Sequence, residues 1–474
     1  MAAVIDVVSD DLPPDAAGRL PLFAALAGTV AFGPGGALSR DAFLADVAAA
    51  AAVLPDALAR PGSAAAPGGV INLCEDRDRF LVAFAAAAVR GLTTLLPPSR
   101  TPTAIADVLA QYPGSVCIAE RTPAPVPPGL LQLPTPGTAA AAIPVEALAR
   151  ATVAADAVAL VAFTSGSTGT PSPNPKTWGS VACSSAQNLA ALADLWPAGG
   201  PRQVVATVPP QHMYGMELSV LLPLFATVGV HAARPFFPDD IARALADAGA
   251  PALLVTTPVH LRALLESGVA LPRMAGIVTA TAPLPQALAE AAETRFGCEV
   301  RELFGSSETC VIARRRTARE SRWRPFPGVR LQPQPDGTLV HAPQLAQPVA
   351  LADLVDGADC GWSARGRAGR PVRPAHRSRG CAPAAAHLPP VSARPYPATI
   401  RSPSRPHFRS PAPMPHALTV FLLTLGYAAA GSLLLWIGYR LFDRLTPGDM
   451  HAKIFEEGNT AVAVLAGAFV LGLS

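Results

Sequence analysis

Apolar runs of strand length alternate with alanine-rich stretches of helical period from the N-terminus to about residue 360. The runs expected as strands are Val70–Leu73, Thr93–Leu96, Val116–Ala119, Ala157–Phe163, Val204–Val208, Leu253–Thr256 and Ile277–Ala280. The stretches expected as helices are Arg77–Arg90, Ser184–Leu195, Asp239–Ala248 and Pro285–Phe296. Since strands that alternate with helices form parallel sheets covered by helices, the pattern predicts an α/β fold with layered, mostly parallel sheets.

The pattern ends abruptly after residue 360. Residues 363–413 contain 11 prolines, 10 arginines and no acidic residue. Such a composition offers little apolar surface to offset the entropy of ordering. We therefore expect residues 361–413 to be a disordered Pro/Arg-rich linker, or a stretch translated out of frame.

A long uncharged segment follows this linker. Ala417–Tyr439 has 23 residues without a charge and ends in Trp436 and Tyr439, which is typical of a transmembrane helix. A buried helix of a soluble domain is the alternative. Thr460–Ser474 is also apolar but too short to span a bilayer comfortably. Residues 414–474 thus predict a truncated membrane segment in contact with lipid, and arginines on both flanks leave its orientation open.

Composition and charge further restrict the kinds of function and site that we expect. A net charge of +3 over 474 residues gives no indication of nucleic-acid binding. The seven cysteines lack CxxC spacing and are expected as reduced thiols, without a zinc site. The acidic N-terminus does not resemble a signal peptide. Only Lys176 and Lys453 are lysines among 37 basic residues, so Lys176 attracts attention within the α/β region.

The segment after the apolar run Ala157–Phe163 is rich in hydroxyl groups and glycine. Backbone N–H groups of such a loop can surround an anion, and the hydroxyls add donors. It lacks the GxxxxGK[ST] pattern of a Walker loop, and an ordinary turn is the alternative. The candidate phosphate-binding residues are Thr164, Ser165, Gly166, Ser167, Thr168 and Gly169.

The segment TSGSTGTP, residues 164–171, resembles the phosphate-binding signature of the adenylate-forming (AMP-binding) superfamily of acyl-CoA synthetases, aryl-CoA ligases and related enzymes. The resemblance implies that this loop holds the β- and γ-phosphates of ATP. Family members usually have a lysine directly after the proline, where this chain has Ser172. Lys176, four residues later, either supplies this displaced charge or is a solvated surface lysine.

Two further segments resemble the family's motifs in the family's order. TATAPL, residues 279–284, resembles the stretch whose backbone lines the adenine pocket, with Thr281, Ala282 and Pro283 at its centre. FGSSET, residues 304–309, resembles the aromatic-G-x-T-E motif. By this resemblance Phe304 stacks on adenine beside Gly305, Ser307 contacts the α-phosphate, and Glu308 binds Mg²⁺, for which a carboxylate is a suitable ligand.

Two single residues complete the candidate site. Asp353 lies where the family has the aspartate that binds both ribose hydroxyls, although the usual TGD neighbours are missing. QHMYG, residues 211–215, resembles the segment that lines the acid pocket. His212 therefore either faces the acid substrate or is a structural histidine.

The resemblance implies an acid–thiol ligase that consumes ATP with Mg²⁺. A carboxylic acid becomes an acyl-adenylate, and its acyl group passes to the thiol of CoA or of a phosphopantetheine acyl carrier protein. Lys176, His212 and Glu308 are the candidate catalytic residues. INLCEDRDRF from Ile71 and LLPPSR from Leu95 are most similar to ligases of aryl-polyene pigment clusters, which suggests an aromatic hydroxy acid or a fatty acid as substrate.

The resemblance to the ligases covers residues 1–360 as one adenylation domain and stops before the family's C-terminal lysine domain. Residues 414–474 resemble small bacterial inner-membrane proteins of unknown function. We expect an impaired ligase, cytoplasmic but tethered to the inner membrane, or simply cytoplasmic if a frameshift joined two genes. The alternative is a catalytically dead nucleotide-binding module fused to a membrane protein.

Overall fold

The computed structural model describes residues 15, 17–56, 68–138, 143–164, 171–358 and 361–367. All of them belong to the first of two compact units, Met1–Arg377. Most of the expected linker and both expected membrane helices, 417–439 and 460–474, lie outside the described residues. Within the described ranges, no helix combines the length and the apolar character that crossing a bilayer requires.

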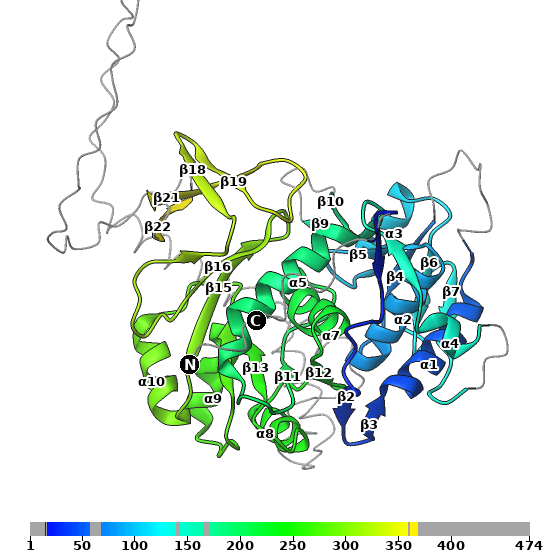
Figure 1. The fold of residues 1–474 in the computed structure, drawn as a ribbon, viewed down its shortest axis with the longest axis horizontal. Coiled ribbons are helices and arrows are strands. Elements are labelled where there is room, and N and C mark those ends of the chain that lie inside the picture. The colour runs from blue at the N-terminus through cyan, green and yellow to red at the C-terminus, as the bar shows by residue number, and fades with distance from the viewer. Residues whose placement is uncertain are drawn as a thin grey trace, which may run out of the picture. The chain divides into compact units, whose positions relative to one another are not determined.

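Two large sheets form the framework of this unit (Figure 1). In the six-stranded sheet only the edge strand β10 is antiparallel to its neighbour. The strands in spatial order are β10 (Ser172–Thr177), β9 (Val158–Thr164), β5 (Thr93–Leu96), β4 (Gly69–Asn72), β6 (Val116–Ala119) and β7 (Leu130–Gln132).

The nine-stranded sheet is parallel in its centre and antiparallel at both edges. Its order is β17 (Arg324–Pro325), β16 (Cys310–Arg315), β15 (Val300–Ser306), β14 (Gly276–Thr279), β13 (Leu253–Thr256), β11 (Gln203–Ala206), β12 (Gly229–His231), β2 (Thr29–Gly33) and β3 (Gly36–Ser39). Because β15 turns back into β16, the residues between these two strands lie at the carboxyl edge of the parallel strands.

Helices pack on both faces of the two sheets because their strands alternate apolar side chains between the faces. Val70 faces the layer between the sheets, while Ile71 faces the outer helix α3 (Pro102–Gln111). The layer between the sheets contains α1 (Arg40–Val53), α2 (Arg77–Val89), α5 (Trp178–Leu192), α6 (Met213–Met216), the π-helical turn η2 (Glu217–Leu221) and α7 (Leu222–Phe225). The outer face of the nine-stranded sheet is covered by α8 (Pro238–Asp247), α9 (Pro258–Ser267) and α10 (Gln286–Phe296).

Smaller antiparallel sheets complete the unit. They are β1 (Arg19–Pro21) with β8 (Thr152–Ala154), β18 (Arg330–Gln334) with β19 (Gly337–His341) and β20 (Val349–Leu351), and β21 (Asp353–Ala358) with β22 (Gly361–Arg367). The short helices α4 (Val145–Leu148) and η1 (Ala193–Leu195) lie in connections. In Figure 1 the strands β18, β19, β21 and β22 lie together beyond β15 and β16.

The predicted α/β class and the mostly parallel character of the main sheets are confirmed. All the expected strands and helices form, with ends shifted by a few residues: the run expected at Ser184–Leu195 begins earlier, as α5 at Trp178. The small antiparallel sheets and the hairpin partner β10 were not predicted.

Candidate nucleotide and acid site

The candidate phosphate loop joins the two strands of a hairpin. Thr164 is the last residue of β9 and is paired with Ser172 of β10. Its hydroxyl accepts a hydrogen bond from Asn174 Nδ2 at 3.4 Å. Ser165, Gly166, Ser167, Thr168 and Gly169 lie outside the described residues. The structure therefore places the two ends of the loop together, and the phosphate contacts of the loop stay a prediction.

Ser307 and Glu308 lie in the tight turn between β15 and β16. Gly305 is required there, because a Cβ atom at this position would come within 2.3 Å of the Cys310 carbonyl oxygen. Cys310 itself has a positive φ of 61°, an uncommon conformation for a residue other than glycine. Ser306 and Thr309 bond each other through their hydroxyls at 3.1 Å. The turn is thus held closely by its own side chains.

The carboxylate of Glu308 is half-buried and makes no hydrogen bond or ion pair with any described residue. A carboxylate held on a constrained turn without a protein partner suits a hard cation that also bridges phosphates. The part of the chain that the structure describes contains no group of three or more potential metal ligands. Magnesium commonly binds proteins through one or two carboxylates together with substrate phosphates, so Glu308 fits that mode.

The structure gives Lys176 a partner that the sequence analysis did not anticipate, the backbone of Glu308. Its side chain is 5% exposed, so it is not a solvated surface lysine. Its ammonium group donates to the backbone carbonyl of Glu308. An ammonium group has three N–H donors, so this bond to the turn that carries Glu308 uses one of them, and a phosphate contact of Lys176 stays a prediction.

The candidate adenine segment follows β14. Thr281 has a positive φ of 78°, and Thr281, Ala282 and Pro283 are exposed. The segment is anchored at Leu284, whose backbone N–H donates to Glu302 Oε1 at 2.9 Å. The exposed residues 281–283 thus follow the carboxyl end of β14, which neighbours β15, and their contact with adenine stays a prediction.

Phe304 lies at the junction between the nine-stranded sheet and the β21–β22 pair. Its ring centroid is 4.8 Å from that of Trp362 in an edge-on contact, and 5.3 Å from that of Trp323. Asp353 begins β21, and its carbonyl accepts a hydrogen bond from Thr338 Oγ1 at 2.6 Å. The packing of Trp362 thus brings the strand pair that carries Asp353 against Phe304. The contacts of both residues with adenine and ribose stay predictions.

His212 belongs to a group of basic residues at the carboxyl ends of strands from both sheets. Arg100 follows β5, His212 follows β11, Arg234 follows β12, and His260 lies in the first turn of α9 after β13. The pKa of His212 is lowered because surrounding protein desolvates the ring and because the Arg100 and Arg234 guanidinium groups repel a further proton. The imidazole is therefore neutral near pH 7 and remains accessible to solvent.

Arg77 strengthens the positive potential in this region. Its side chain is 0% exposed and donates to neutral acceptors only, the carbonyls of Ala206 and Val208 and the Ser219 hydroxyl. Burial and the nearby Arg234 lower the pKa of Arg77 to about 9. Arg234 is exposed and forms no ion pair with any described residue. An anionic group at this edge of the sheets would compensate these charges.

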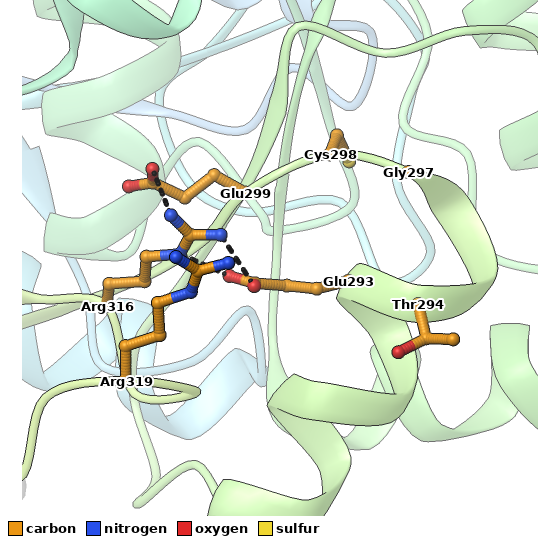
Figure 2. Close-up of a pocket in the computed structure, with 7 residues that line it drawn as sticks. All are labelled: Glu293, Thr294, Gly297, Cys298, Glu299, Arg316 and Arg319. Carbon is orange, nitrogen blue, oxygen red and sulfur yellow. Dashed lines mark hydrogen bonds and ion pairs between the residues drawn. The ribbon is translucent and has the colours of Figure 1, made fainter.

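A different hollow of about 330 Å³ lies beside the C-terminal end of α10 (Figure 2). Figure 2 shows Arg316 between Glu293 and Glu299, with Arg319 beside it. Arg316 pairs with Glu293 at 2.8 Å and with Glu299 at 3.3 Å. Because this hollow lies near the start of β15, at the edge opposite the β15–β16 turn, and its charges neutralise each other, it is not the candidate site.

Sequence reasoning missed Glu217, Gln344, Arg77 and Arg234 in this region. One signal could have identified Glu217, since it is the only charged residue in the apolar stretch Met213–Phe225. Its side chain is 2% exposed and accepts hydrogen bonds from Ser184, Asn188 and the Val311 N–H. Gln344 gave no such signal, because its neighbours in sequence are ordinary loop residues.

Comparisons with known proteins identify the family of the chain and its fold. Residues 19–339 match the model of the AMP-binding enzyme family. Residues 416–474 match a family described only as a domain of unknown function, DUF350. A 4-coumarate–CoA ligase of Rhodobacter capsulatus is 36% identical over 153 residues, which cover 32% of this chain and 38% of that protein. A 4-coumarate–CoA ligase of Halorhodospira halophila is 30% identical over 200 residues, which cover 40% of this chain and 44% of that protein.

The chain therefore spans less than half of the length of these two relatives. Among solved structures, the amide bond synthetase McbA from Marinactinospora thermotolerans is similar with a TM-score of 0.57 at 19% identity, covering 72% of this chain and 77% of that one. The o-succinylbenzoate CoA synthetase of Bacillus subtilis in complex with AMP has a TM-score of 0.56 at 15% identity. The match covers 72% of this chain and 76% of that one. These likenesses establish the fold. Since the family model covers more than half of the sequence, the chain belongs to the AMP-binding enzyme family.

Proposed function

We propose that this chain binds ATP with Mg²⁺ and activates a carboxylic acid as an acyl-adenylate for transfer to a thiol. The observation that carries the proposal is the Glu308 carboxylate, which has no partner among the described residues. It lies on a turn that Lys176 of β10 contacts, and β10 begins just after the candidate phosphate loop. Family membership and the names of the relatives, which are CoA ligases, support the same chemistry.

In the proposed reaction a carboxylate oxygen of the acid attacks the α-phosphorus of ATP, and pyrophosphate leaves with the electrons of the broken P–O bond. Mg²⁺ at Glu308 would neutralise charge on the phosphates as it develops. Ser307, one residue away, would donate a hydrogen bond to the α-phosphate. Alignment and charge neutralisation of this kind contribute most of the catalysis expected for such a step.

Arg234, which has no ion pair among the described residues, supports an anionic partner at the carboxyl edge of both sheets, together with His212 and His260. Arg100 adds to the positive charge but already pairs with Glu75 at 3.6 Å. A neutral His212 can donate or accept a hydrogen bond without competing electrostatically with the guanidinium groups. We propose that this region receives the acid and the phosphate-bearing acceptor, either CoA or the phosphopantetheine arm of a carrier protein. An aromatic hydroxy acid or a fatty acid is the proposed substrate class, as in aryl-polyene ligases.

Release of pyrophosphate from ATP tests this function directly. We expect release that depends on Mg²⁺ and on one member of a panel of hydroxybenzoic, coumaric and fatty acids. Glu308→Gln keeps the shape but removes the charge, so Mg²⁺-dependent ATP binding should be lost while the melting temperature changes little. Adding CoA or a loaded carrier protein then identifies the acceptor by the thioester formed.

A second candidate function is nucleotide binding without turnover. The Pro/Arg-rich composition of residues 363–413 favours it, because it stands where family members continue into their lysine domain. MgATP binding without pyrophosphate release for any acid would support this alternative. For location, we propose membrane association through residues 417–439, and recovery of the full chain in the soluble fraction would contradict it.

A further inference from the structure

The start of β16, directly after the turn that carries Glu308, is irregular. Cys310 has a positive φ of 61°, a strained conformation for a residue with a side chain. The register between β15 and β16 shifts after Phe304, because Phe304 is paired with Ala313 while Gly305 is paired with Val311. A strand that begins with a strained residue and a bulge keeps its course only when surrounding groups hold it.

Two side chains from distant parts of the chain hold the backbone on both sides of Cys310. Glu217 of η2 accepts a hydrogen bond from the Val311 N–H at 3.1 Å. Gln344, which follows β19, donates from Nε2 to the Thr309 carbonyl at 3.1 Å and to the Val311 carbonyl at 3.4 Å. Both side chains are buried, with exposed fractions of 2% for Glu217 and 3% for Gln344. Since hydrogen bonds in a buried setting are costly to leave unmade, these contacts define the path of β16.

One face of α5 in turn holds both of these side chains. Ser180, Ser184 and Asn188 follow one another at intervals of four residues, so they lie on the same side of the helix. We call these three residues the α5 polar stripe. The Ser180 hydroxyl donates to the Gln344 backbone carbonyl at 2.7 Å. The Ser184 hydroxyl and Asn188 Nδ2 donate to the Glu217 carboxylate at 2.6 and 3.1 Å.

All of these supports reach backbone atoms and none reaches the Glu308 carboxylate. Lys176 donates to the Glu308 carbonyl, while Glu217 and Gln344 contact the peptide groups that follow it. Within the part of the chain that the structure describes, the Glu308 carboxylate has no hydrogen bond or ion pair. The backbone next to Glu308 is therefore fixed while its carboxylate stays available to a ligand.

We infer that Glu217 and Gln344, held by the α5 polar stripe, are positioning residues that set the Mg²⁺ affinity of Glu308. They fix the strand that begins two residues after Glu308, and so limit the directions in which its carboxylate can point. The inference rests on the proposed function, since it takes Glu308 as the ligand of the Mg²⁺ that accompanies ATP. Residues that orient a metal ligand without touching the metal typically change metal affinity about 10–100-fold when they are replaced.

Calorimetry of ATP binding to the full chain, at a series of Mg²⁺ concentrations and in EDTA, tests this inference. Gln344→Met keeps the length of the side chain but has no donor. We expect it to raise the Mg²⁺ concentration that gives half of the Mg²⁺-dependent gain in ATP affinity by about tenfold or more. ATP affinity in EDTA should stay unchanged, because only the metal-dependent part of binding involves Glu308.

Gln187→Met is the matched control. Gln187 lies on α5 and donates from Nε2 to the Pro327 carbonyl at 3.0 Å, without contacting the turn. The same substitution therefore removes a similar hydrogen bond elsewhere, and the Mg²⁺ requirement should stay that of the wild type.

Variants of Glu217 separate its hydrogen bond from its charge. Glu217→Gln retains an oxygen that can accept from the Val311 N–H, whereas Glu217→Met has none. We expect Glu217→Gln to keep the wild-type Mg²⁺ requirement and Glu217→Met to raise it about tenfold. An equal rise in both variants would show that the charge acts instead, and would overturn the positioning role of Glu217.

Melting temperatures of all variants distinguish loss of positioning from loss of the fold. Ser180→Ala is the mildest change, because it removes only the bond to the Gln344 backbone, and it should raise the Mg²⁺ requirement at a nearly unchanged melting temperature. If Gln344→Met does not fold, Ser180→Ala decides. A wild-type Mg²⁺ requirement in the folded variant would overturn the inference and leave the proposed function intact. Absence of Mg²⁺-dependent ATP binding in the wild-type chain would overturn the proposed function itself.

Discussion

Glu302 connects the candidate adenine segment to the nine-stranded sheet. Its carboxylate is 2% exposed and accepts hydrogen bonds from the Leu284 N–H at 2.9 Å, Arg315 Nε at 2.7 Å and the Thr317 hydroxyl at 2.6 Å. Arg315 in turn lies 4.3 Å above the ring of Trp323. Removal of this carboxylate would therefore leave a cation, a backbone N–H and a hydroxyl without their common partner.

The expected loss of unfolding free energy follows from these contacts of Glu302. Glu302→Ala breaks a buried ion pair, which costs roughly 3–5 kcal/mol of unfolding free energy. Glu302→Gln keeps an acceptor for the Leu284 N–H but loses the charge, so we expect a loss of about 1.5–3 kcal/mol. Because Leu284 anchors the segment from Thr281 to Pro283, ATP affinity should also fall in Glu302→Ala and fall less in Glu302→Gln.

The assay is urea unfolding followed by tryptophan fluorescence, with ATP affinity measured in parallel. A lower midpoint at constant m-value reports a change in stability. Arg324→Ala is the control, since Arg324 is exposed and its pair with Glu320 lies at the surface, so its loss should cost no more than about 1 kcal/mol. A Glu302→Ala variant as stable as this control, or one with unchanged ATP affinity, would refute the reasoning.

Three further predictions test other parts of the molecule. The pKa of His212 should lie below 6.5 in an NMR titration because of burial and two guanidinium groups, and Arg234→Gln should raise it; an unchanged value would contradict the electrostatic account. Although burial alone would raise the pKa of Glu293, hydrogen bonds from Arg316 and the Val300 N–H and nearby positive charge hold it below the ordinary 4.5. Its contribution to stability is therefore complete above pH 4.5 and lost as pH falls through the lowered pKa, so the stability of Glu293→Gln should vary less with pH in that range. Finally, the DNA after the codon of residue 360, read in another frame, should encode a lysine-bearing domain, and sequencing of the locus that finds both alternative frames closed beyond codon 363 would exclude this.

Much of the fold could be read from local sequence. Strands such as Thr93–Leu96 and Leu253–Thr256 were predicted with the observed bounds, because short apolar runs between helical stretches fit buried parallel strands. β10 was missed because Ser172–Thr177 contains Pro173 and Pro175. Proline has no backbone N–H to donate to a neighbouring strand, but an edge strand tolerates it. Only the assembled sheet shows that β10 is at the edge.

The candidate site likewise has motifs that the sequence identified and contacts that only the tertiary structure revealed. The motifs around Thr164, Thr281 and Glu308 are contiguous, so the sequence alone identified them as candidates. The partners of Lys176 and Glu217 are 132 and 94 residues away along the chain, at Glu308 and Val311. Sequence showed that Lys176 is unusual but assigned it to the phosphates or to solvent. Only the packing of β10 against the β15–β16 turn showed that Lys176 is buried and donates to the Glu308 carbonyl, because a buried ammonium group takes whichever acceptor the tertiary structure places beside it.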